Sequence, residues 1–371
     1  MKISILTLLL IAQYVGILTG QTTVSGAQKP VTFLCPPCGL DCDTVHFQKP
    51  GLCPVCGMKL FASYSGYENK QGEHLDVCHK KVAVVLFPGV EIIDFSGPWE
   101  VFGAAGMDVF SVAASDSILP AGMGLKIKPD YSFANAPTPD IILVPGGNVD
   151  PSDTIVVNWI RKTSGQSAHT MSVCTGAFLL AAGGLLDNLT ATTNYPAVPV
   201  LRGLATQTTV TDTVRFVDNG RIITSAGLSS GMDAAFHLVA LYLGKAQTKK
   251  LANELEYGWN EENPFVRGRL AEKHVQDFLS VFTPFDYEMT EYTGDRDKWL
   301  VTVRVKTSLD KYDLLRLSAV QLEQVAGWKR GGNKNSWTFD DYGKKWSAGL
   351  HYLQKGNGEY FLSLEVILDK H

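Results

Sequence analysis

The middle of the chain contains the segment Met171-Ser172-Val173-Cys174-Thr175-Gly176-Ala177, in which an apolar run meets a cysteine and then a second apolar stretch. The first run predicts a buried strand over residues 171–173, and the second predicts a helix over residues 177–186. A nucleophile between a strand and a helix lies on a sharp turn at the carboxyl edge of a sheet. Cys174 is therefore a candidate nucleophile, and the start of the helix is expected to lower the pKa of its thiol.

Strand and helix patterns alternate around this segment. Further buried strands are predicted over residues 82–87, 109–114 and 141–144, and further helices over residues 98–105, 152–162 and 230–243. This alternation predicts an α/β fold over residues 82–260, a three-layer αβα sandwich with a mainly parallel, flavodoxin-like sheet. Residues 206–223 alternate around Asp218-Asn219-Gly220, which predicts a hairpin.

A glycine pair follows one of these strands. The strand over residues 141–144 ends in Pro145-Gly146-Gly147. Two glycines free the backbone there to present amides to a ligand. The amide of Thr175 and one near Gly147 are therefore candidates for an oxyanion hole.

The whole chain has the composition of a globular protein. It has 371 residues, 45% of them apolar, and its 33 basic and 37 acidic residues give a formal charge of -4. This balance excludes whole-chain disorder, a general nucleic-acid surface and a polybasic membrane signal. We expect a signal peptide over residues 1–20, a metal module over residues 30–62, a linker over residues 63–81, the α/β domain and a final domain over residues 261–371.

The amino terminus predicts export. Lys2 is followed by a short apolar run and then by Thr19-Gly20-Gln21, the pattern of a secretory signal with a cleavage site. A retained anchor is the alternative, although the run is too short and too interrupted for a comfortable membrane span. We expect a secreted or periplasmic protein with no stable membrane span after cleavage, in an oxidising compartment.

Six of the seven cysteines cluster between Cys35 and Cys78. Two C-x-x-C pairs, Cys35 with Cys38 and Cys53 with Cys56, have the spacing of two knuckles that complete one tetrahedral site. We expect one zinc or other soft metal ion there, with two disulfides as the alternative. Cys42 and His46 are extra candidate ligands, and Cys78 has no evident partner. The module resembles the small heavy-metal-binding domains of bacterial metal-handling proteins through the Cys-Pro-x-Cys-Gly-Met sequence at residues 53–58, although those domains often have His where this chain has Cys38.

The carboxyl-terminal segment predicts a small α+β domain. Helices are predicted over residues 265–280 and 312–325, and strands over residues 299–305, 345–353 and 359–368. Its four tryptophans could form a ligand surface, but core packing is the better interpretation. Its even charge and β pattern do not suit a DNA-binding domain.

The middle domain resembles the ThiJ/PfpI superfamily, the family of the Parkinson disease protein seven, which has a class I glutamine amidotransferase-like fold. The resemblance covers roughly residues 82–259. The motifs that carry it are Leu86-Phe87-Pro88-Gly89, Asp94-Phe95-Ser96-Gly97-Pro98, Val144-Pro145-Gly146-Gly147, Ser172-Val173-Cys174-Thr175-Gly176 and Thr192-Thr193-Asn194-Tyr195. The branch that it resembles most is that of the isonitrile hydratases and the amino-terminal halves of some AraC-type regulators.

This resemblance implies roles for individual residues. Cys174 matches the nucleophile, and Asp94 matches an acidic residue that bonds the thiol or acts as general acid and base. Thr175 matches the residue after the nucleophile, while Gly146 and Gly147 match the amide-bearing loop. Alternatively, Cys174 could be an inert part of the scaffold, and Asp94 could only cap the helix predicted to begin near Pro98.

The chain departs from the family where a histidine is often found. Branch members commonly read Thr-Thr-His-Trp, whereas this chain reads Thr192-Thr193-Asn194-Tyr195, so that Asn194, a candidate residue of the substrate pocket, replaces the histidine. Protease-like members have His directly after the cysteine, where this chain has Thr175. A peptidase is therefore disfavoured. His169 and His237 are interpreted as structural residues.

Two functions from different classes follow. The first is an exported cysteine-dependent hydratase or hydrolase acting on a small electrophilic carbon, without a cofactor in the α/β domain. The second is a non-catalytic small-ligand or metal- and redox-responsive module on the same fold. We also expect a homodimer and no nucleic-acid partner.

Overall fold

The protein is described by a computed structural model covering residues 30–35, 42, 45–64, 80–263, 265–341, 343–355 and 358–369. The predicted signal peptide, Cys38, Cys78 and most of the linker over residues 63–81 lie outside the described residues. The chain divides into one unit over Met1–Leu75 and another over Asp76–His371. Among the described residues, no helix combines the length and apolar character needed to cross a membrane.

The first unit contains a small two-stranded sheet. Strand β1 (Val31–Leu34) pairs antiparallel with β2 (Phe61–Tyr64), and the chain between them crosses back where Phe33 bridges Phe47. The buried apolar side chains described in this unit are those of Leu34, Leu60 and three cysteines, and the last four form one cluster. So small an apolar core needs another source of stability.

The α/β domain is built on a seven-stranded sheet in the order β12-β13-β9-β8-β3-β4-β7. Its strands are β3 (Lys81–Val85), β4 (Asp108–Ala113), β7 (Tyr131–Ser132), β8 (Ile141–Val144), β9 (His169–Val173), β12 (Phe216–Asp218) and β13 (Ile222–Ser225). All neighbours are parallel except β12 and β13, which form the hairpin predicted around Asp218-Asn219-Gly220. The predicted strands and their mainly parallel pairing are confirmed.

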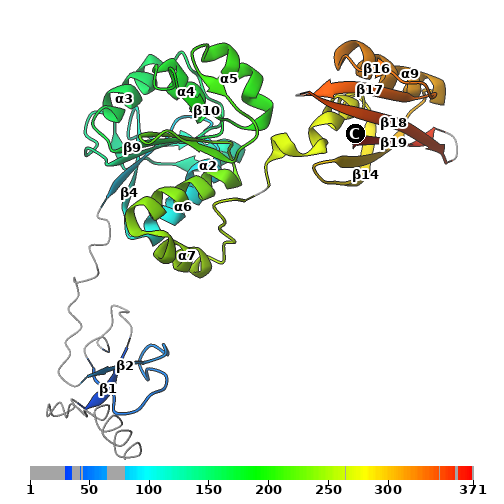
Figure 1. The fold of residues 1–371 in the computed structure, drawn as a ribbon. Coiled ribbons are helices and arrows are strands. Elements are labelled where there is room, and N and C mark those ends of the chain that lie inside the picture. The colour runs from blue at the N-terminus through cyan, green and yellow to red at the C-terminus, as the bar shows by residue number, and fades with distance from the viewer. Residues whose placement is uncertain are drawn as a thin grey trace, which may run out of the picture. The chain divides into compact units, whose positions relative to one another are not determined.

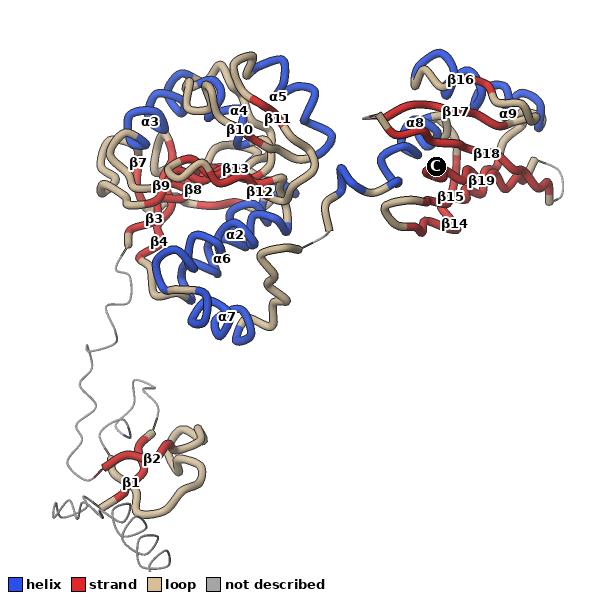
Figure 2. The backbone as a smooth tube through the Cα atoms, viewed as in Figure 1, coloured by secondary structure: helices blue, strands red, loops and turns tan. Residues whose placement is uncertain are grey.

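Helices cover both faces of this sheet, as Figures 1 and 2 show. One face carries α3 (Thr154–Ser164), α4 (Gly176–Ala182) and α5 (Val198–Leu204), and the other carries α2 (Ile92–Ala104), α6 (Ser229–Leu243) and α7 (Lys245–Glu254). The predicted three-layer αβα sandwich is confirmed. Smaller elements are β5 (Leu119–Pro120) with β6 (Lys126–Ile127), β10 (Thr190–Ala191) with β11 (Thr209–Val210), and the 3-10 turns η2 (Gly122–Gly124) and η3 (Tyr195–Ala197).

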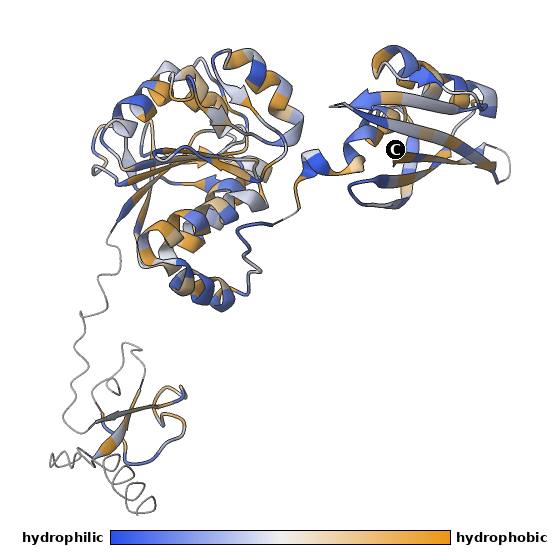
Figure 3. Ribbon diagram, in the orientation of Figure 1, coloured by the Kyte–Doolittle hydropathy of each residue, from blue (hydrophilic) through white to orange (hydrophobic). Residues whose placement is uncertain are grey.

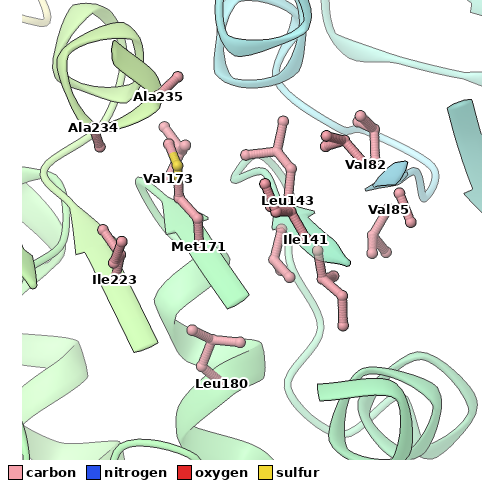
Figure 4. Close-up of a cluster of buried hydrophobic side chains, with 14 of the residues drawn as sticks. Val82, Val85, Ile141, Leu143, Met171, Val173, Leu180, Ile223, Ala234 and Ala235 are labelled. Carbon is pink, nitrogen blue, oxygen red and sulfur yellow. The ribbon is translucent and has the colours of Figure 1, made fainter. Parts of the chain in front are cut away.

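The core lies between the sheet and both helix layers. Strand β8 is buried along its whole length, and β3 is buried at every residue after Lys81, which explains their continuous apolar sequences. Figure 4 shows Ile141 and Leu143 beside Met171 and Val173 of the neighbouring strand. Figure 3 shows the same concentration of apolar residues along the central strands.

Two helices differ from their predicted bounds. Helix α2 begins at Ile92 rather than near Pro98, so the proline lies inside it. Because proline is common in the first turn of a helix, Pro98 predicted a helix start that lies six residues too late. Helix α4 stops at Ala182 rather than Leu186, because Gly183 and Gly184 follow it.

The carboxyl-terminal part contains a six-stranded antiparallel sheet in the order β14-β15-β19-β18-β17-β16. Its elements are β14 (Asp286–Gly294), β15 (Lys298–Lys306), β16 (Lys329–Arg330), β17 (Ser336–Asp341), β18 (Lys344–Gln354), β19 (Glu359–Leu368), α8 (Gln276–Ser280), α9 (Lys311–Val320) and the π-helical turn η6 (Gln321–Val325). The predicted α+β domain is confirmed. The helix predicted over residues 265–280 is wrong in its first half, which forms the short 3-10 turns η4 (Arg267–Arg269) and η5 (Ala271–Val275) before α8.

The four tryptophans of this part pack into its core. Trp299, Trp328, Trp337 and Trp346 are all buried. The prediction of core packing over an aromatic ligand surface is therefore confirmed.

Candidate active site and metal centre

Cys174 lies on the turn between β9 and α4, as the sequence predicts. Its φ of 57° is in the left-handed region, which non-glycine residues seldom adopt and which surrounding structure must hold in place. Two glycines allow the close packing. A Cβ on Gly176 would lie 2.2 Å from the carbonyl oxygen of Val144, and one on Gly227 would lie 2.6 Å from the Cβ of Cys174.

Asp94 lies directly beside this cysteine. It belongs to the first turn of α2, is fully buried, and hydrogen-bonds to the thiol. Its Oδ2 accepts the backbone N–H of Gly146 at 3.1 Å, and its Oδ1 accepts that of Leu228 at 3.0 Å. The alternative that Asp94 only caps a helix starting near Pro98 is therefore wrong. Burial raises the pKa of Asp94 to about 6, although the hydrogen bonds oppose this shift.

The thiol of Cys174 is held in its protonated form. Burial, and then the charge of Asp94, raise the pKa of Cys174 to about 12. The amide and hydroxyl of Thr175 act in the opposite direction. The helix start thus lowers the pKa as expected, but desolvation and the neighbouring carboxylate outweigh it, so the net shift of the pKa is upward. Near neutral pH the pair has one proton, on sulfur, and Asp94 is positioned to accept it.

The glycine loop is bound to the rest of the site. The N–H of Gly147 donates to Oγ1 of Thr175 at 2.9 Å, and the Thr175 hydroxyl lies 3.0 Å from the carbonyl oxygen of Gly147. A Cβ on Gly146 would lie 2.7 Å from the Cβ of Cys174 and 2.8 Å from Oδ2 of Asp94. Both loop amides have partners inside the protein, so the predicted use of a Gly147 amide in an oxyanion hole is not what the structure displays.

A cavity of about 460 Å³ opens above the thiol. Cys174, Thr175, Gly147 and Asn194 all line it, whereas Asp94 and Gly146 are not among its lining residues. The volume falls in the range of small-molecule sites. Among the described residues that line it there is no histidine. The structure therefore brings four of the predicted site residues around a space for a small ligand, with Asp94 and Gly146 next to Cys174 but outside the lining.

Sequence reasoning missed part of the cavity wall. Arg215 and residues 265–268 also line it. They come from a hairpin strand end and from the segment after α7, and no motif marks them. The predicted structural histidines lie elsewhere: His169 bonds the hydroxyl of Tyr242 at 2.8 Å, and His237 bonds Asp218 at 2.8 Å.

Four cysteines of the first unit converge. The sulfurs of Cys35, Cys42, Cys53 and Cys56 all lie within 4.8 Å of one another. Cys42, an extra candidate in the sequence, stands where Cys38 was expected, and Cys38 lies outside the described residues. These four thiols are free of disulfides. His46 instead shares a hydrogen bond with Thr32, at 2.7 Å.

The second knuckle has the backbone geometry of a thiolate site. The N–H of Cys53 donates to the carbonyl of Met58, and Gly57, with φ 77°, closes the turn by donating to the carbonyl of Cys53. A hydrogen bond from the backbone of Met58 lowers the pKa of Cys56 to about 7. The donor set of four sulfurs suits Zn²⁺ or another soft ion.

Comparison with known proteins places the α/β domain in a family. The model described as the DJ-1/PfpI family matches residues 80–241. The isonitrile hydratase of Pseudomonas putida is 33% identical over 182 residues, which cover 48% of this chain and 78% of that protein. An uncharacterized protein in the cpoL 5' region of Streptomyces lividans is 35% identical over 123 residues, 31% of this chain and 87% of that protein. The crystal structure of a ThiJ/PfpI family protein from Pseudomonas syringae matches with a TM-score of 0.47 and 24% identity, over 56% of this chain and 87% of that one. By its family model and by an identity of 33% across most of a relative, the chain belongs to the DJ-1/PfpI family.

Proposed function

We propose that the α/β domain is a cysteine-dependent hydratase that converts isonitriles to N-substituted formamides. The observation that carries this proposal is the buried pair of Asp94 and Cys174, in which a carboxylate is positioned to take the proton of a thiol facing a small-molecule cavity. The similarity to an isonitrile hydratase supports the substrate class.

In the first stage the sulfur of Cys174 bonds to the terminal carbon of the isonitrile. The thiol proton passes to Asp94, and Asp94 then gives it to that same carbon, which leaves a thioimidate on the enzyme and a carboxylate at Asp94. Proton transfer to and from Asp94 suits a group whose pKa is raised to about 6, because such a carboxyl exchanges protons near neutral pH.

In the second stage water adds to the thioimidate carbon. Asp94 accepts one proton of the water and delivers it to nitrogen. The C–S bond then breaks, the hydroxyl proton returns to sulfur, and the formamide leaves. The sum is one isonitrile and one water giving one formamide, with Cys174 and Asp94 restored. The amide and hydroxyl of Thr175 stabilise the sulfur whenever it carries negative charge.

The test is turnover of n-butyl isonitrile by the full-length protein, with N-butylformamide measured by mass spectrometry. We expect product from the wild type, none from Cys174→Ser, and greatly reduced product from Asp94→Asn. Saturable binding of the isonitrile without product would instead favour the non-catalytic binding module.

We also propose that the first unit binds one Zn²⁺ through Cys35, Cys42, Cys53 and Cys56 as a structural staple. Zn–S bonds of about 2.3 Å in a tetrahedron set the sulfurs about 3.8 Å apart. The observed sulfurs of Cys35 and Cys56 lie 3.1 Å apart and all four lie within 4.8 Å, so the observed separations bracket that spacing. The ion would supply the stability that so small an apolar core lacks. Export of the protein, on the strength of residues 1–20, and homodimer formation remain proposals as well.

A further inference from the structure

Part of the cavity wall comes from outside the family domain. Residues 265–268, here called the strap, line the cavity, whereas the family model ends at residue 241. The strap follows α7 and precedes the carboxyl-terminal sheet. It therefore lies outside the segment that the family model matches, on the wall of the site that contains Cys174.

The strap is fixed to the α/β domain at both of its ends. Nη1 of Arg215 donates to the carbonyl oxygen of Phe265 at 2.8 Å. The other nitrogens of that guanidinium bind the buried carboxylate of Asp233 and Oγ of Ser229, so Arg215 is held from several sides. Gly268 packs against the backbone of Asp212 so closely that a Cβ would lie 2.0 Å from its carbonyl oxygen.

Two cations at this wall, Arg267 of the strap and Arg215 beside it, are already paired with carboxylates. Arg267 makes two hydrogen bonds of 3.0 Å to the buried carboxylate of Glu272, and Arg215 is paired with Asp233. An anionic substrate therefore gains no unpaired guanidinium at this wall.

The apolar surface that the strap offers to a ligand is chiefly that of Phe265. Phe265 is 59% exposed, so its ring has free surface for a ligand to cover, and Val266 is buried beside it. Leu228, 52% exposed, adds apolar area from the turn before α6. This apolar part of the wall suits an uncharged organic substituent, while polar lining residues such as Thr193 and Asn194 lie elsewhere around the cavity.

We infer that the strap, chiefly Phe265, sets the size limit for the organic group of the substrate, which is compact, uncharged and apolar. This inference rests on the proposed function insofar as the ligand is a substrate. The strap, however, limits access to Cys174 for any reagent. Because its anchors are Arg215 and Gly268, a change that unseats the strap has the same effect as a change that removes the ring of Phe265.

The test compares a small and a bulky thiol reagent on the full-length protein. Iodoacetamide and N-(1-pyrenyl)maleimide are applied separately, and modification of the Cys174 peptide is followed by mass spectrometry. We expect Phe265→Ala and Gly268→Ala to raise the ratio of bulky to small labelling rates on the order of ten-fold, the effect typical of a few methylene groups in an apolar pocket. The matched controls are Ile155→Ala, at a similarly exposed apolar residue outside the cavity lining, and Gly258→Ala, where a Cβ meets nothing within 4 Å.

The same variants are assayed with n-butyl and adamantyl isonitrile. A shift of turnover toward the bulky isonitrile in Phe265→Ala supports the inference. An unchanged labelling ratio in Phe265→Ala overturns it, and that variant alters only an exposed ring, so misfolding does not account for the result. A changed labelling ratio in a protein that hydrates neither isonitrile leaves the strap established and the proposed function refuted. Hydration of an isonitrile together with unchanged labelling ratios supports the proposed function and refutes the inference about the strap.

Discussion

The carboxyl group of Asp94 hydrogen-bonds to the thiol of Cys174 inside the α/β domain, and its charge helps to raise the pKa of that thiol to about 12. The two groups titrate as a coupled pair with one proton over a wide range of pH. The sulfur becomes a nucleophile only when its proton can leave, and Asp94 is the group within reach. The reactivity of Cys174 therefore depends on the charge of Asp94.

Asp94→Asn is expected to change both labelling and turnover. Removing the negative charge lowers the pKa of the thiol, although burial still keeps it above its usual range. The profile of Cys174 alkylation against pH should therefore move to lower pH, as measured by mass spectrometry of its peptide. Hydration should fall by about 10²–10⁴-fold, because the general acid and base is lost.

The control for this change is Asp150→Asn, an exposed carboxyl outside the cavity lining. It should leave both profiles unaltered. An alkylation profile that is the same in Asp94→Asn and in the wild type means that the two side chains are not coupled, and the binding-module function then becomes the better proposal.

The pH dependence of hydration should show one acid limb near neutral pH. Asp94 must be ionised to accept the thiol proton, and burial raises its pKa to about 6. The value of kcat/KM should therefore fall as pH decreases through about 6. Since the pKa of Cys174 is about 12, deprotonation of the thiol causes no second limb at mildly alkaline pH. An acid limb near the usual carboxyl pKa of about 4 would contradict the assignment of this group to Asp94.

Gly176→Ala should weaken the turn that presents Cys174. The added methyl group would meet the carbonyl oxygens of Val144 and Pro145 at 2.2 and 2.7 Å, so the backbone must shift. Overpacking of this kind costs about 1–3 kcal/mol. Exposure of Cys174 to a thiol reagent in increasing urea should begin at a lower concentration. Gly203→Ala on α5, where a Cβ meets nothing within 4 Å, should shift it little or to higher urea.

The sequence was sufficient for the features that depend on local patterns. Buried parallel strands such as β8 have continuous apolar sequences, and the turn at Cys174 follows from a strand, a nucleophile and a small residue in succession. The association of Asp94 with Cys174 came from the family resemblance, since no spacing along the chain brings the start of α2 to the end of β9.

Features that depend on distant parts of the chain were not predicted. The strap reaches the cavity through Arg215 and Asp212, and its sequence suggested an ordinary helix. The raised pKa of Cys174 was missed because a helix start is visible in the sequence, whereas the burial that outweighs it arises only on folding. Cys42 was undervalued because the paired C-x-x-C spacing already supplied four ligands.

Zinc content should distinguish Cys42 from Cys38 as the fourth ligand of the metal centre. Protein made with ample zinc under reducing conditions should contain about one Zn²⁺ per chain, because four thiolates complete a tetrahedral site. If Cys42 is a ligand, as its sulfur position indicates, Cys42→Ser should lose zinc as fully as Cys53→Ser does, because each removes one of four ligands. Cys38→Ser should then keep the ion, and His46→Ala should keep it too, since that ring pairs with Thr32. Elemental analysis after gel filtration measures the content of each variant. Loss of zinc in Cys38→Ser with retention in Cys42→Ser would restore the simple C-x-x-C pairing, and metal-free protein with two disulfides among these cysteines would overturn the metal site itself.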